Sequence, residues 1–547
     1  MNTRIPKSLV ALLACLLVVA AAPLQAQQKP AAVISIAGVD EIMGDIGYVA
    51  EAVGAGDAAG LVRFVAGQYT QHLDGTKPSG VVVSVDAGIP QALGFLPIKD
   101  LNALLAQTEE QLGQAEDLGN GVFKINGPQP VFLKKSGAWV FVSNAAETLA
   151  TAPADPVAAL GDLPTKYDIG VQVNVQSIPA PLRQQAVQEM TKAFEASLEQ
   201  QAAFAPDPAQ AEMQAKLGRN AIKQLTMMIQ ETDTVSLGLS VDSDKKHILL
   251  DMSITAAEGT KLAGQMNLLK GLKTRFGGFN MPGSAATLSV TSKLTKEEIE
   301  QNLLMIQAMH TKAQEEIDKD DSLPDAQAKE TVKNVLASLV EVATKTIEKG
   351  ESDGGAVLLL NEQSGVQFAA GGYIADGAAL DQAFRSIVEL GKNEPDFPEV
   401  KFDAANHAGV TFHTMSMPIP TGDEDVRKAL GDTIHVVLGT GQESVYVAFG
   451  QNSIDLIKKV IDASQDPSPG KPLNLQVSAT PILEFAVRMS DGDPNIKRVL
   501  DAVKESGNRD KLQMTVGSVD RGISLQVKVD EGLLNLAPKP PAEEDGF

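Results

Sequence analysis

The chain has little of what most reactive or stacking sites require. Its 547 residues include one cysteine, one tryptophan, five tyrosines and six histidines, and aromatic residues make up only 4% of the composition. The shortage of cysteine and histidine argues against thiolate chemistry, disulfides and the usual zinc sites. The shortage of aromatic residues argues against surfaces on which sugars or single-stranded nucleic acid stack.

Positive charge and long apolar runs are also scarce. Lysine and arginine total 46 against 69 aspartates and glutamates, for a net charge of −23. Such a surface repels nucleic acid and anionic lipid, so we expect no nucleic-acid partner. The alternative interpretation is that the acidity only keeps the protein soluble. Beyond residue 26 we find no apolar run long enough to cross a bilayer and expect no transmembrane segment in the mature chain.

The first 26 residues have the three parts of a secretory signal peptide. Arg4 and Lys7 supply a basic start, residues 9–22 form an apolar run, and Ala26 is a small residue suited to cleavage. We expect export to the periplasm or the extracellular space and a mature chain without cysteine. The competing interpretation is a lipoprotein signal cleaved at Cys15, which would leave an apolar new N-terminus.

The order of predicted elements then repeats. Each half begins as strand, helix, helix, strand, with strands at 32–36 and 80–85 and again at 286–291 and 356–360. We therefore predict an α+β fold of two related halves, 27–283 and 284–535, produced by internal duplication. Each half would be a mostly antiparallel sheet covered by helices. Residues 536–547, rich in proline and acids, predict a disordered acidic tail.

Further signals occur in the same order in both halves. Each half has a strand that leads to a helix-capping asparagine, then an alternating strand that leads to a helix-starting proline, and finally a hairpin. In the first half these are 139–142, Asn144, 168–175, Pro179 and the hairpin 235–241 with 247–254. In the second half they are 446–449, Asn452, 473–477, Pro481 and the hairpin 512–516 with 523–529.

Each half also carries one long pair of amphipathic helices. The patterns predict helices at 180–203 and 209–230 in the first half, and at 295–318 and 324–349 in the second. Methionines on these helices would line an adaptable binding groove or, alternatively, fill the core. They are Met190, Met213, Met227, Met228, Met305 and Met309.

Matches to catalytic and nucleotide-binding motifs are few and have simpler interpretations. Gly54, Gly56 and Gly60 have the dinucleotide-binding spacing, but the residues before them have helical periodicity, so we expect a helix end followed by a new helix. Ser243 and Lys246 have the spacing of a serine acylase but fall in a predicted hairpin turn. We find no phosphate loop, nucleophile elbow or His-Glu-x-x-His helix. Trp139 lies in an alternating strand and should be buried.

Metal-binding patterns are equally incomplete. Asp491, Asp493 and Asn495 begin like a calcium loop, but Ile496 occupies the glycine position, and we expect Asp493 to cap a helix instead. Weak calcium binding stays an open alternative. His407 and His413 on one continuous strand would be about 20 Å apart. A cluster of these two with His435 would need the fold to bring them together, and the remaining histidines, His72, His247 and His310, are predicted at the surface.

Three stretches resemble a family of exported planctomycete proteins. They are residues 75–86 (GTKPSGVVVSVD), 96–101 (LPIKDL) and 167–179 (YDIGVQVNVQSIP). The resemblance covers much of the N-terminal half, and its motifs are strand and turn patterns without catalytic identity. It implies export and an α+β fold, and it carries over no functional residues.

The sequence designates no catalytic, cofactor-binding or metal-binding residue and implies no cofactor. We expect a non-enzymatic protein of the cell envelope that acts by surface or cleft recognition. Its partner would be a protein, an envelope polymer or a small ligand. The alternatives are a periplasmic hydrolase that uses Asp and Glu residues at the interface between halves, and a carrier of apolar molecules. The sequence does not specify the ligand or the oligomeric state.

Overall fold

The computed structural model of the chain describes residues 29–86, 88–127, 129–203, 208–320, 326–362, 365–392, 397–420, 422 and 424–536. The predicted signal peptide, and the predicted tail from residue 537 on, lie outside these residues. The chain divides into two compact units. Unit 1 comprises Met1–Gln200, Ala221–Ala263 and Ala537–Phe547, and unit 2 comprises Gln201–Asn220 and Gly264–Leu536.

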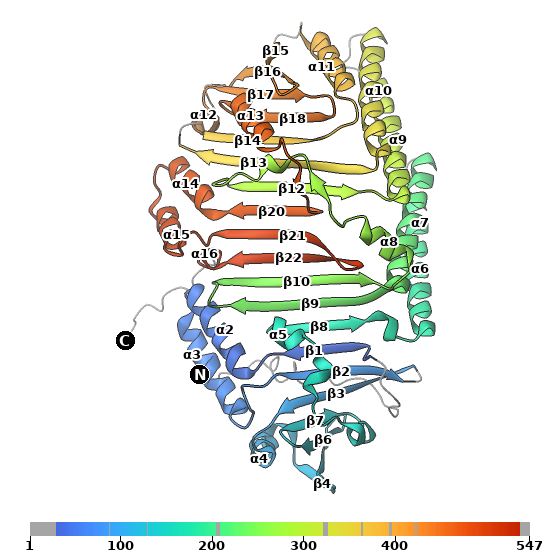
Figure 1. Cartoon of the computed structure of the whole chain (residues 1–547), viewed down its shortest axis with the longest axis vertical. Helices are drawn as coiled ribbons and strands as arrows, with labels where there is room; N and C mark the ends of the chain where they lie inside the picture. Colours follow the sequence, from blue (N-terminus) through green and yellow to red (C-terminus); the bar gives the residue numbers. More distant parts are fainter. Residues whose placement is uncertain are drawn as a thin grey trace. The chain divides into compact units, whose positions relative to one another are not determined.

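The described part of unit 1 contains an antiparallel sheet with the strand order β10-β9-β8-β1-β2-β3-β7-β6-β5-β4 (Figure 1). Its strands are β1 (Ala32–Ile36), β2 (Ser79–Asp86), β3 (Ile89–Pro97), β4 (Ala115–Gly119), β5 (Val122–Ile125), β6 (Val131–Ser136), β7 (Trp139–Ser143), β8 (Ile169–Asn174), β9 (Thr232–Asp242) and β10 (His247–Ala256).

The described part of unit 2 contains an antiparallel sheet with the strand order β22-β21-β20-β12-β13-β14-β18-β17-β16-β15. Its strands are β12 (Ala286–Lys293), β13 (Glu351–Asn361), β14 (Gly365–Tyr373), β15 (Glu399–His407), β16 (Val410–Pro418), β17 (Thr433–Thr440), β18 (Ser444–Phe449), β20 (Leu473–Ser478), β21 (Lys511–Val519) and β22 (Gly522–Asp530). A separate short pair joins β11 (Lys273–Thr274) to β19 (Ser468–Pro469).

The two sheets have the same strand order when β1 is matched with β12 and the chain is followed from there. Ala32 of β1 has partners on β2 and β8, and Ala286 of β12 has partners on β13 and β20. The ladders also close in the same way, because Asn174 donates its backbone N–H to the Ala31 carbonyl at 2.8 Å and Ser478 donates to Ala285 at 2.9 Å. A residue in one sheet can therefore be matched to its counterpart in the other by counting along paired strands.

Most helices occupy corresponding connections in both units, although their lengths differ; α12, between β16 and β17, has no counterpart among the described residues between β5 and β6. Those in the first part of the chain are α2 (Val39–Ala52), α3 (Gly56–Thr70), α4 (Leu101–Leu112), α5 (Leu163–Lys166), α6 (Ala180–Ala203), α7 (Pro208–Glu231) and α8 (Lys261–Asn267). The later ones are α9 (Lys296–Lys319), α10 (Ala326–Glu348), α11 (Gly377–Gly391), α12 (Glu424–Leu430), α13 (Ser453–Ala463), α14 (Ala479–Met489), α15 (Pro494–Glu505) and α16 (Glu531–Leu534). Short 3₁₀ helices η1 (Glu147–Thr151) and η2 (Val157–Leu160) follow β7, where α13 follows β18 in unit 2.

Helix starts show how the sequence sets these elements. Asp100 accepts a hydrogen bond from the Ala103 backbone N–H at 3.1 Å, and Asp376 accepts one from Ala379 at 3.0 Å, each three residues after the strand before it ends. Both are N-cap aspartates, which satisfy a helix donor that would otherwise lack a partner. The start of α9 has a full capping box formed by Thr295 and Glu298.

Each unit has its own hydrophobic core. In unit 1 one cluster surrounds Phe95, Trp139 and Phe141, and a second lies between the sheet and α4. In unit 2 the largest cluster joins the sheet to α13, whose Ile457 and Val460 are almost fully buried. Trp139 is 7% exposed, which confirms its predicted burial.

Most element predictions agree with the structure. The strand at 32–36, the two hairpins and the four long helices are confirmed. Of the two predicted asparagine caps, Asn452 is the N-cap residue of α13, whereas Asn144 is not the N-cap of η1. Asn452 precedes α13 in a left-handed conformation without a capping hydrogen bond, and Asn144 is followed by the 3₁₀ helix η1, whose N-cap is Ala146. Pro481 lies in the first turn of α14, which begins two residues earlier.

The terminal strands β4 and β15 are both irregular. The ladder between β4 and β5 shifts register between Asp117 and Gly119, and the ladder between β15 and β16 shifts between Lys401 and Ala405. Within the second shift, Asp403 has a φ of 53°. These shifts are β-bulges, which bend a strand and interrupt its pairing.

Candidate functional site: a cleft in unit 2

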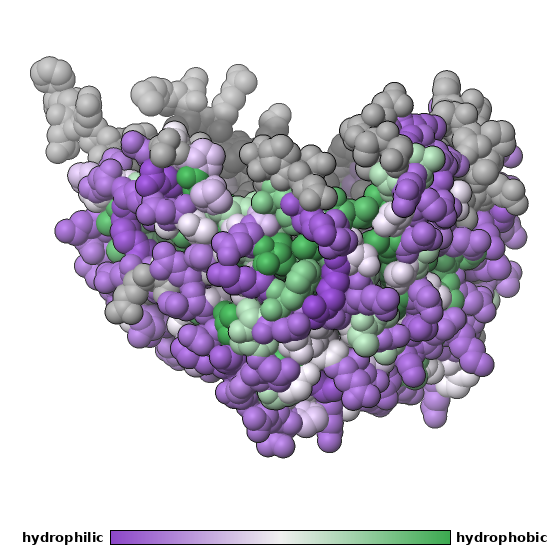
Figure 2. Space-filling model, turned by 90° about the horizontal axis from the view of Figure 1, so that it is seen from above, coloured by the Kyte–Doolittle hydropathy of each residue, from purple (hydrophilic) through white to green (hydrophobic). Residues whose placement is uncertain are grey.

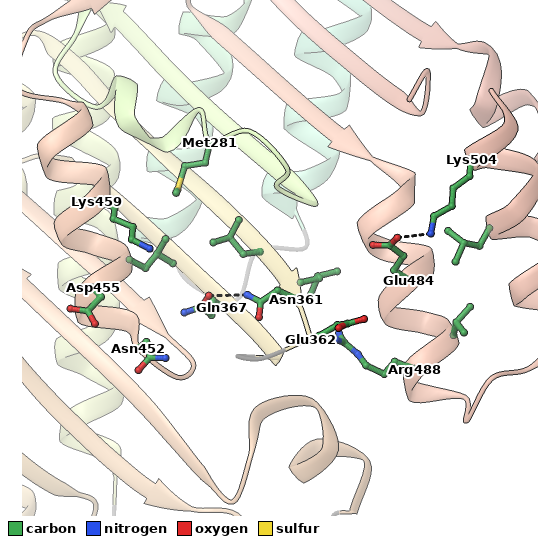
Figure 3. Close-up of a pocket in the computed structure, with 15 residues that line it drawn as sticks. Met281, Asn361, Glu362, Gln367, Asn452, Asp455, Lys459, Glu484, Arg488 and Lys504 are labelled. Carbon is green, nitrogen blue, oxygen red and sulfur yellow. Dashed lines mark hydrogen bonds and ion pairs between the residues drawn. The ribbon is translucent and has the colours of Figure 1, made fainter. Parts of the chain in front are cut away.

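A cleft of about 1000 Å³ opens within unit 2 beside the hairpin of β13 and β14 (Figure 3). One wall is α13, and the opposite wall is formed by α14 and α15. The three helices are amphipathic. In α13, Ile457 and Val460 are buried in the core, while Asp455 and Lys459 lie on the side that lines the cleft. The wall across the cleft is fixed by Asp493, which caps α15 by accepting the Asn495 N–H at 2.7 Å.

The floor of the cleft carries a pair of side-chain amides. Asn361, the last residue of β13, donates from Nδ2 to Oε1 of Gln367 on β14 at 3.1 Å. The Gln367 Nε2 donates to the backbone carbonyl of Gln451, just before α13. Gln367 is 7% exposed, so these bonds satisfy an amide that is largely removed from water. Met281 and Leu359 add apolar surface beside it.

Charges of both signs surround this floor. Glu484 of α14 pairs with Lys504 of α15 at 2.7 Å, and both side chains are about half exposed, at 51% and 48%. The Arg488 guanidinium lies 5.2 Å from the centre of the Phe485 ring. Lys459 extends from the opposite wall (Figure 3). A ligand in the cleft would therefore meet apolar and amide groups at the base and ionic groups at the rim.

The cleft offers groups for binding and few for covalent chemistry. Its described lining contains no serine, histidine, cysteine or tyrosine, and no aromatic ring. Its acids are Glu362, Asp455 and Glu484. Among the described residues of the chain, no group of three or more His, Cys, Asp or Glu side chains is placed to hold a metal ion.

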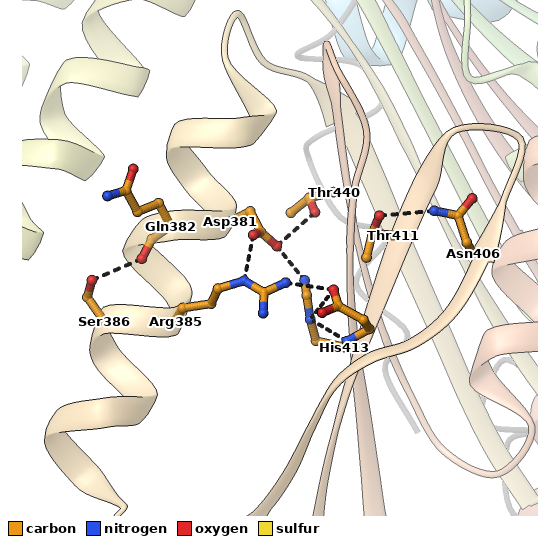
Figure 4. Close-up of polar contacts among 9 residues, drawn as sticks. Asp381, Gln382, Arg385, Ser386, Asn406, Thr411, His413 and Thr440 are labelled. Carbon is orange, nitrogen blue, oxygen red and sulfur yellow. Dashed lines mark hydrogen bonds and ion pairs between the residues drawn. The ribbon is translucent and has the colours of Figure 1, made fainter.

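A second polar cluster lies elsewhere in unit 2, where α11 packs beside β16 and β17 (Figure 4). His413 is 1% exposed and bonds through Nε2 to Asp381 of α11. Its Nδ1 accepts the Asp403 backbone N–H at 3.2 Å, so Nε2 carries the ring proton and donates. Asp381 also accepts from Arg385 at 2.8 Å and from Thr440 at 3.3 Å.

The electrostatics of this cluster hold Asp381 ionised. Burial by itself would raise the pKa of Asp381, but the hydrogen bonds from Arg385 and His413 outweigh it and leave the pKa below its usual value. Two carboxylates, Asp381 and Asp403, raise the pKa of the Arg385 guanidinium further. Phe384 and Phe402 enclose the imidazole at 5.5 and 5.7 Å between ring centres. The cluster is a closed network that ties α11 to the sheet.

Hydrophobic surface accompanies the outer side of this cluster. Phe402 is 37% exposed, and Ile387 and Leu390 of α11 are 42% and 37% exposed. The view from the end where α11, β15 and β16 lie shows hydrophobic residues gathered among hydrophilic ones (Figure 2).

The histidines named from sequence do not come together. His407 pairs with Asp462 at 2.7 Å, His413 is in the buried network, and His435 contacts the Ser416 hydroxyl at 3.1 Å. His72, His247 and His310 each have intermediate exposure, partly buried and partly open to solvent.

The glycine motif at 54–60 and the pair Ser243 and Lys246 lie in the elements that the sequence predicts. Gly54 follows α2 and Gly56 begins α3, which confirms the helix-end interpretation. Ser243 and Lys246 lie in the turn between β9 and β10, as predicted. Met305 and Met309 are 48% and 66% exposed, so these two do not fill the core.

Two carboxyl groups in the described part of unit 1 have a raised pKa, Asp45 and Asp168. Burial, with the nearby charges of Asp168 and Glu41, raises the pKa of Asp45 to about 6. Burial also raises the pKa of Asp168, although the Val241 N–H, donated at 2.5 Å, acts in the opposite direction. This hydrogen bond fixes Asp168 to β9, and neither acid lines the cleft.

None of the residues that line the cleft walls stands out as functional in the amino-acid sequence. Lys459 and Arg488 lie on the polar faces of amphipathic helices, where a charged residue is ordinarily only solvated. Only the tertiary fold places them across from each other. The cap at Asp493, which we predicted, was the one local signal that located a wall.

Comparisons with known proteins give no relative. No family model, curated protein or solved structure matches this chain. Within the described ranges, no helix has the length and apolar character to cross a membrane.

Proposed function

We propose that this chain is an exported, non-enzymatic binding protein of the cell envelope, and that the unit 2 cleft binds a polypeptide segment of its partner. The observation that carries the proposal is the cleft itself, with apolar and amide groups at its base and both charges at its rim. Protein interfaces have the same composition, an apolar centre within a polar rim.

The lining favours a polypeptide over other polymers. A polyanion or polycation would be recognised by charge of one sign, whereas Lys459 and Arg488 share the rim with Glu362 and Asp455. A sugar chain would lack the aromatic platforms on which it usually stacks, because the described lining has none. A polypeptide supplies apolar side chains for Met281, backbone amides for the floor and charged side chains for the rim.

The two alternative functions have weaker support. A carrier of apolar molecules needs an enclosed apolar cavity, whereas Asn361, Gln367 and the charged rim make this cleft polar. A hydrolase that uses acids needs two carboxyl groups placed around one substrate bond. Asp45 and Asp168 are two acids with a raised pKa, and the charge of Asp168 acts on Asp45. Asp168, however, accepts the Val241 N–H, and neither acid contributes to the cleft.

Export and internal duplication belong to the same proposal. The basic start and apolar run before Ala26 support export. The shared strand order of the two sheets supports duplication, as do the matched caps Asp100 and Asp376. In a duplicated protein, the two copies of one surface are free to diverge toward different ligands.

The cleft is tested with a phage-displayed library of random linear peptides. We expect enrichment of peptides with an apolar anchor flanked by charges, and binding is then measured by fluorescence anisotropy. The substitutions Lys459→Glu and Arg488→Glu should each weaken the selected peptides about tenfold, the effect of losing one close charge pair.

The matched control is Lys497→Glu, which makes the same charge reversal on an exposed position of α15 outside the cleft. It should leave affinity nearly unchanged. Failure to enrich any peptide, or equal losses in the rim and control variants, would contradict the proposal.

A further inference from the structure

A second, smaller cavity lies in unit 1. It is not part of the cleft on which the proposed function rests. It has a volume of about 230 Å³ and lies between strands β2 and β3 and the segment that contains η1 and η2. Its walls are mostly apolar, formed by Val82, Leu93, Phe95, Pro153, Pro156 and Ala159. The polar residues that line it are Ser84, Gln91 and Thr148.

Gln91 is the unusual member of this lining. It is 3% exposed, and neither its Nε2 nor its Oε1 has a hydrogen-bond partner in the described structure. A buried amide without partners is unfavourable, because it has given up its bonds to water and gained none in return. Such groups are rare in folded proteins, and a bound group that supplies the missing bonds is one of the explanations for them.

The matching residue in unit 2 is Gln367, whose side-chain amide is hydrogen-bonded at both ends. Gln91 and Gln367 are each the third residue of their strand, and they lie directly opposite Ser84 and Leu359. Gln367 has both ends of its amide bonded, to Asn361 and to the Gln451 carbonyl. Both glutamines line hollows beside corresponding pairs of strands, β2 with β3 and β13 with β14, and of the two only Gln91 has no partner.

The cavity selects the chemistry of its occupant. An ordered water needs two to four polar partners, and besides Gln91 only Ser84 and Thr148 offer polar groups in the described lining, so water alone would leave most of the apolar wall without contacts. An apolar cavity of about 150 Å³ holds a benzene molecule, so this one has room for a six-membered ring with a small substituent. The substituent must accept from Nε2 and donate to Oε1, as a primary carboxamide does.

We propose that the unit 1 cavity binds a small apolar molecule with a primary carboxamide, held by two parallel hydrogen bonds to Gln91. Binding should change the surroundings of Trp139, because Phe95 lines the cavity and its ring contacts that of Trp139 edge to face at 5.6 Å between centres. Trp139 is the single tryptophan of the chain and therefore reports binding by fluorescence.

The test titrates the full chain with cyclohexanecarboxamide and with cyclohexyl methyl ketone, which has nearly the same shape but no donor. Both Trp139 fluorescence and calorimetry are recorded. We expect the carboxamide to bind the wild-type protein about tenfold more tightly than the ketone, the effect of one added hydrogen bond to a buried group.

Two substitutions test whether the preference for carboxamide depends on the Gln91 amide or only on the shape of the cavity. Gln91→Met keeps the length of the side chain and should abolish the preference for carboxamide. Gln367→Met, the matched control in unit 2, should preserve it. Equal affinity of the two probes for the wild-type protein, or no binding of either, overturns the proposal whether or not the variants fold. A crystal structure with only water on Gln91 would overturn it too. Peptide binding at the unit 2 cleft is a separate measurement, so the two proposals fail independently.

Discussion

The two sheets share a strand order, yet they use different side chains at matching positions near their β4 and β15 ends. Counting along paired strands matches Phe123 of β5 with His413 of β16. Counting from the caps Asp100 and Asp376 matches Leu105 with Asp381. In unit 1 these residues belong to a hydrophobic cluster, whereas in unit 2 they form the buried histidine network.

A second difference occurs on β8 and β9 and their counterparts β20 and β21. In unit 1 the Tyr167 ring covers two glycines that pair with each other, Gly170 and Gly238. In unit 2 the matching pair is Asn474 and Thr515, joined by a side-chain hydrogen bond at 3.1 Å. The same backbone thus accepts an aromatic cover over glycines or a polar pair.

These differences teach that the strand order does not depend on any one of these contacts. Apolar packing fills the position in unit 1, so the fold itself does not require His413 and Asp381. What each unit requires is internal consistency, because a buried polar group must keep its partner and a glycine under a ring must stay small. We therefore expect a unit to be least stable when one residue of such a contacting pair is replaced and the other is kept.

The largest effect should come from removing Asp381 from the histidine network while its partners are kept. Asp381→Ala leaves the His413 N–H buried without an acceptor and leaves Arg385 with only one of its two carboxylate partners, Asp403. We expect a loss of about 3 kcal/mol in the stability of unit 2. Hydrogen exchange of the β16 and β17 amides, read by mass spectrometry, measures it.

The residue types that unit 1 has at these two positions, leucine and phenylalanine, provide the control. The double variant Asp381→Leu with His413→Phe imports the apolar pair and should recover most of the loss. A double variant as unstable as Asp381→Ala would show that the two positions are not interchangeable between units.

A smaller effect is expected from Gly238→Thr, which places the unit 2 residue under the unit 1 ring. A Cβ at Gly238 would lie 2.3 Å from the Tyr167 ring, so the ring must move and its hydroxyl bond to Asp251 is strained. We expect a loss of about 2 kcal/mol, seen in urea unfolding followed by Trp139 fluorescence. Thr515→Gly should leave this unit 1 signal unchanged, and an unperturbed Gly238→Thr would refute the matching of these positions.

The smallest effect concerns the acids of unit 1 and their pH dependence. Because the folded pKa of Asp45 is raised to about 6, the folded chain binds its proton more tightly than the unfolded chain does. Stability from this group is therefore present at low pH and is lost as the pH rises from about 4 through 6. Asp45→Asn should remove that slope and stabilise unit 1 at pH 7.5 by about 0.5 kcal/mol, a value reduced for solvent screening.

Urea midpoints at several pH values, followed by Trp139 fluorescence, check this expectation. Asp57→Asn, an exposed acid on the neighbouring helix α3, is the control and should leave the slope in place. Parallel pH profiles for the wild type and Asp45→Asn would exclude the effect.

Local patterns predicted the parts of the fold that depend on local chemistry. Residues 32–36 alternate and became β1, and Asp493 capped α15 as its place before Pro494 indicated. Strand β4 was not predicted, because AEDLG lacks an alternating apolar face. In β15 the alternation of Val400, Phe402 and Ala404 is short and ends at the register shift before Ala405. Their pairing is decided by the neighbouring strands and not by their own composition.

The candidate sites were less predictable than the fold. Gln91 and Gln367 are single polar residues in apolar strands, and nothing in their local sequence shows that one is bonded and the other is not. That difference depends on Asn361 and on the Gln451 carbonyl, which come from distant segments. His413 is similar, since its partner Asp381 lies 32 residues away.

The bulges at β4 and β15 bear on how these molecules behave at high concentration. A terminal strand whose unpaired N–H and C=O groups form a regular row is a template on which another chain can add a strand and begin a fibre. At β15 the row is broken where Asp403 adopts its left-handed conformation, and the Asp403 carboxylate is drawn to Arg385 at 2.6 Å. A sheet that ends this way offers an incoming strand too few consecutive partners to extend it, which protects the chain against self-polymerisation.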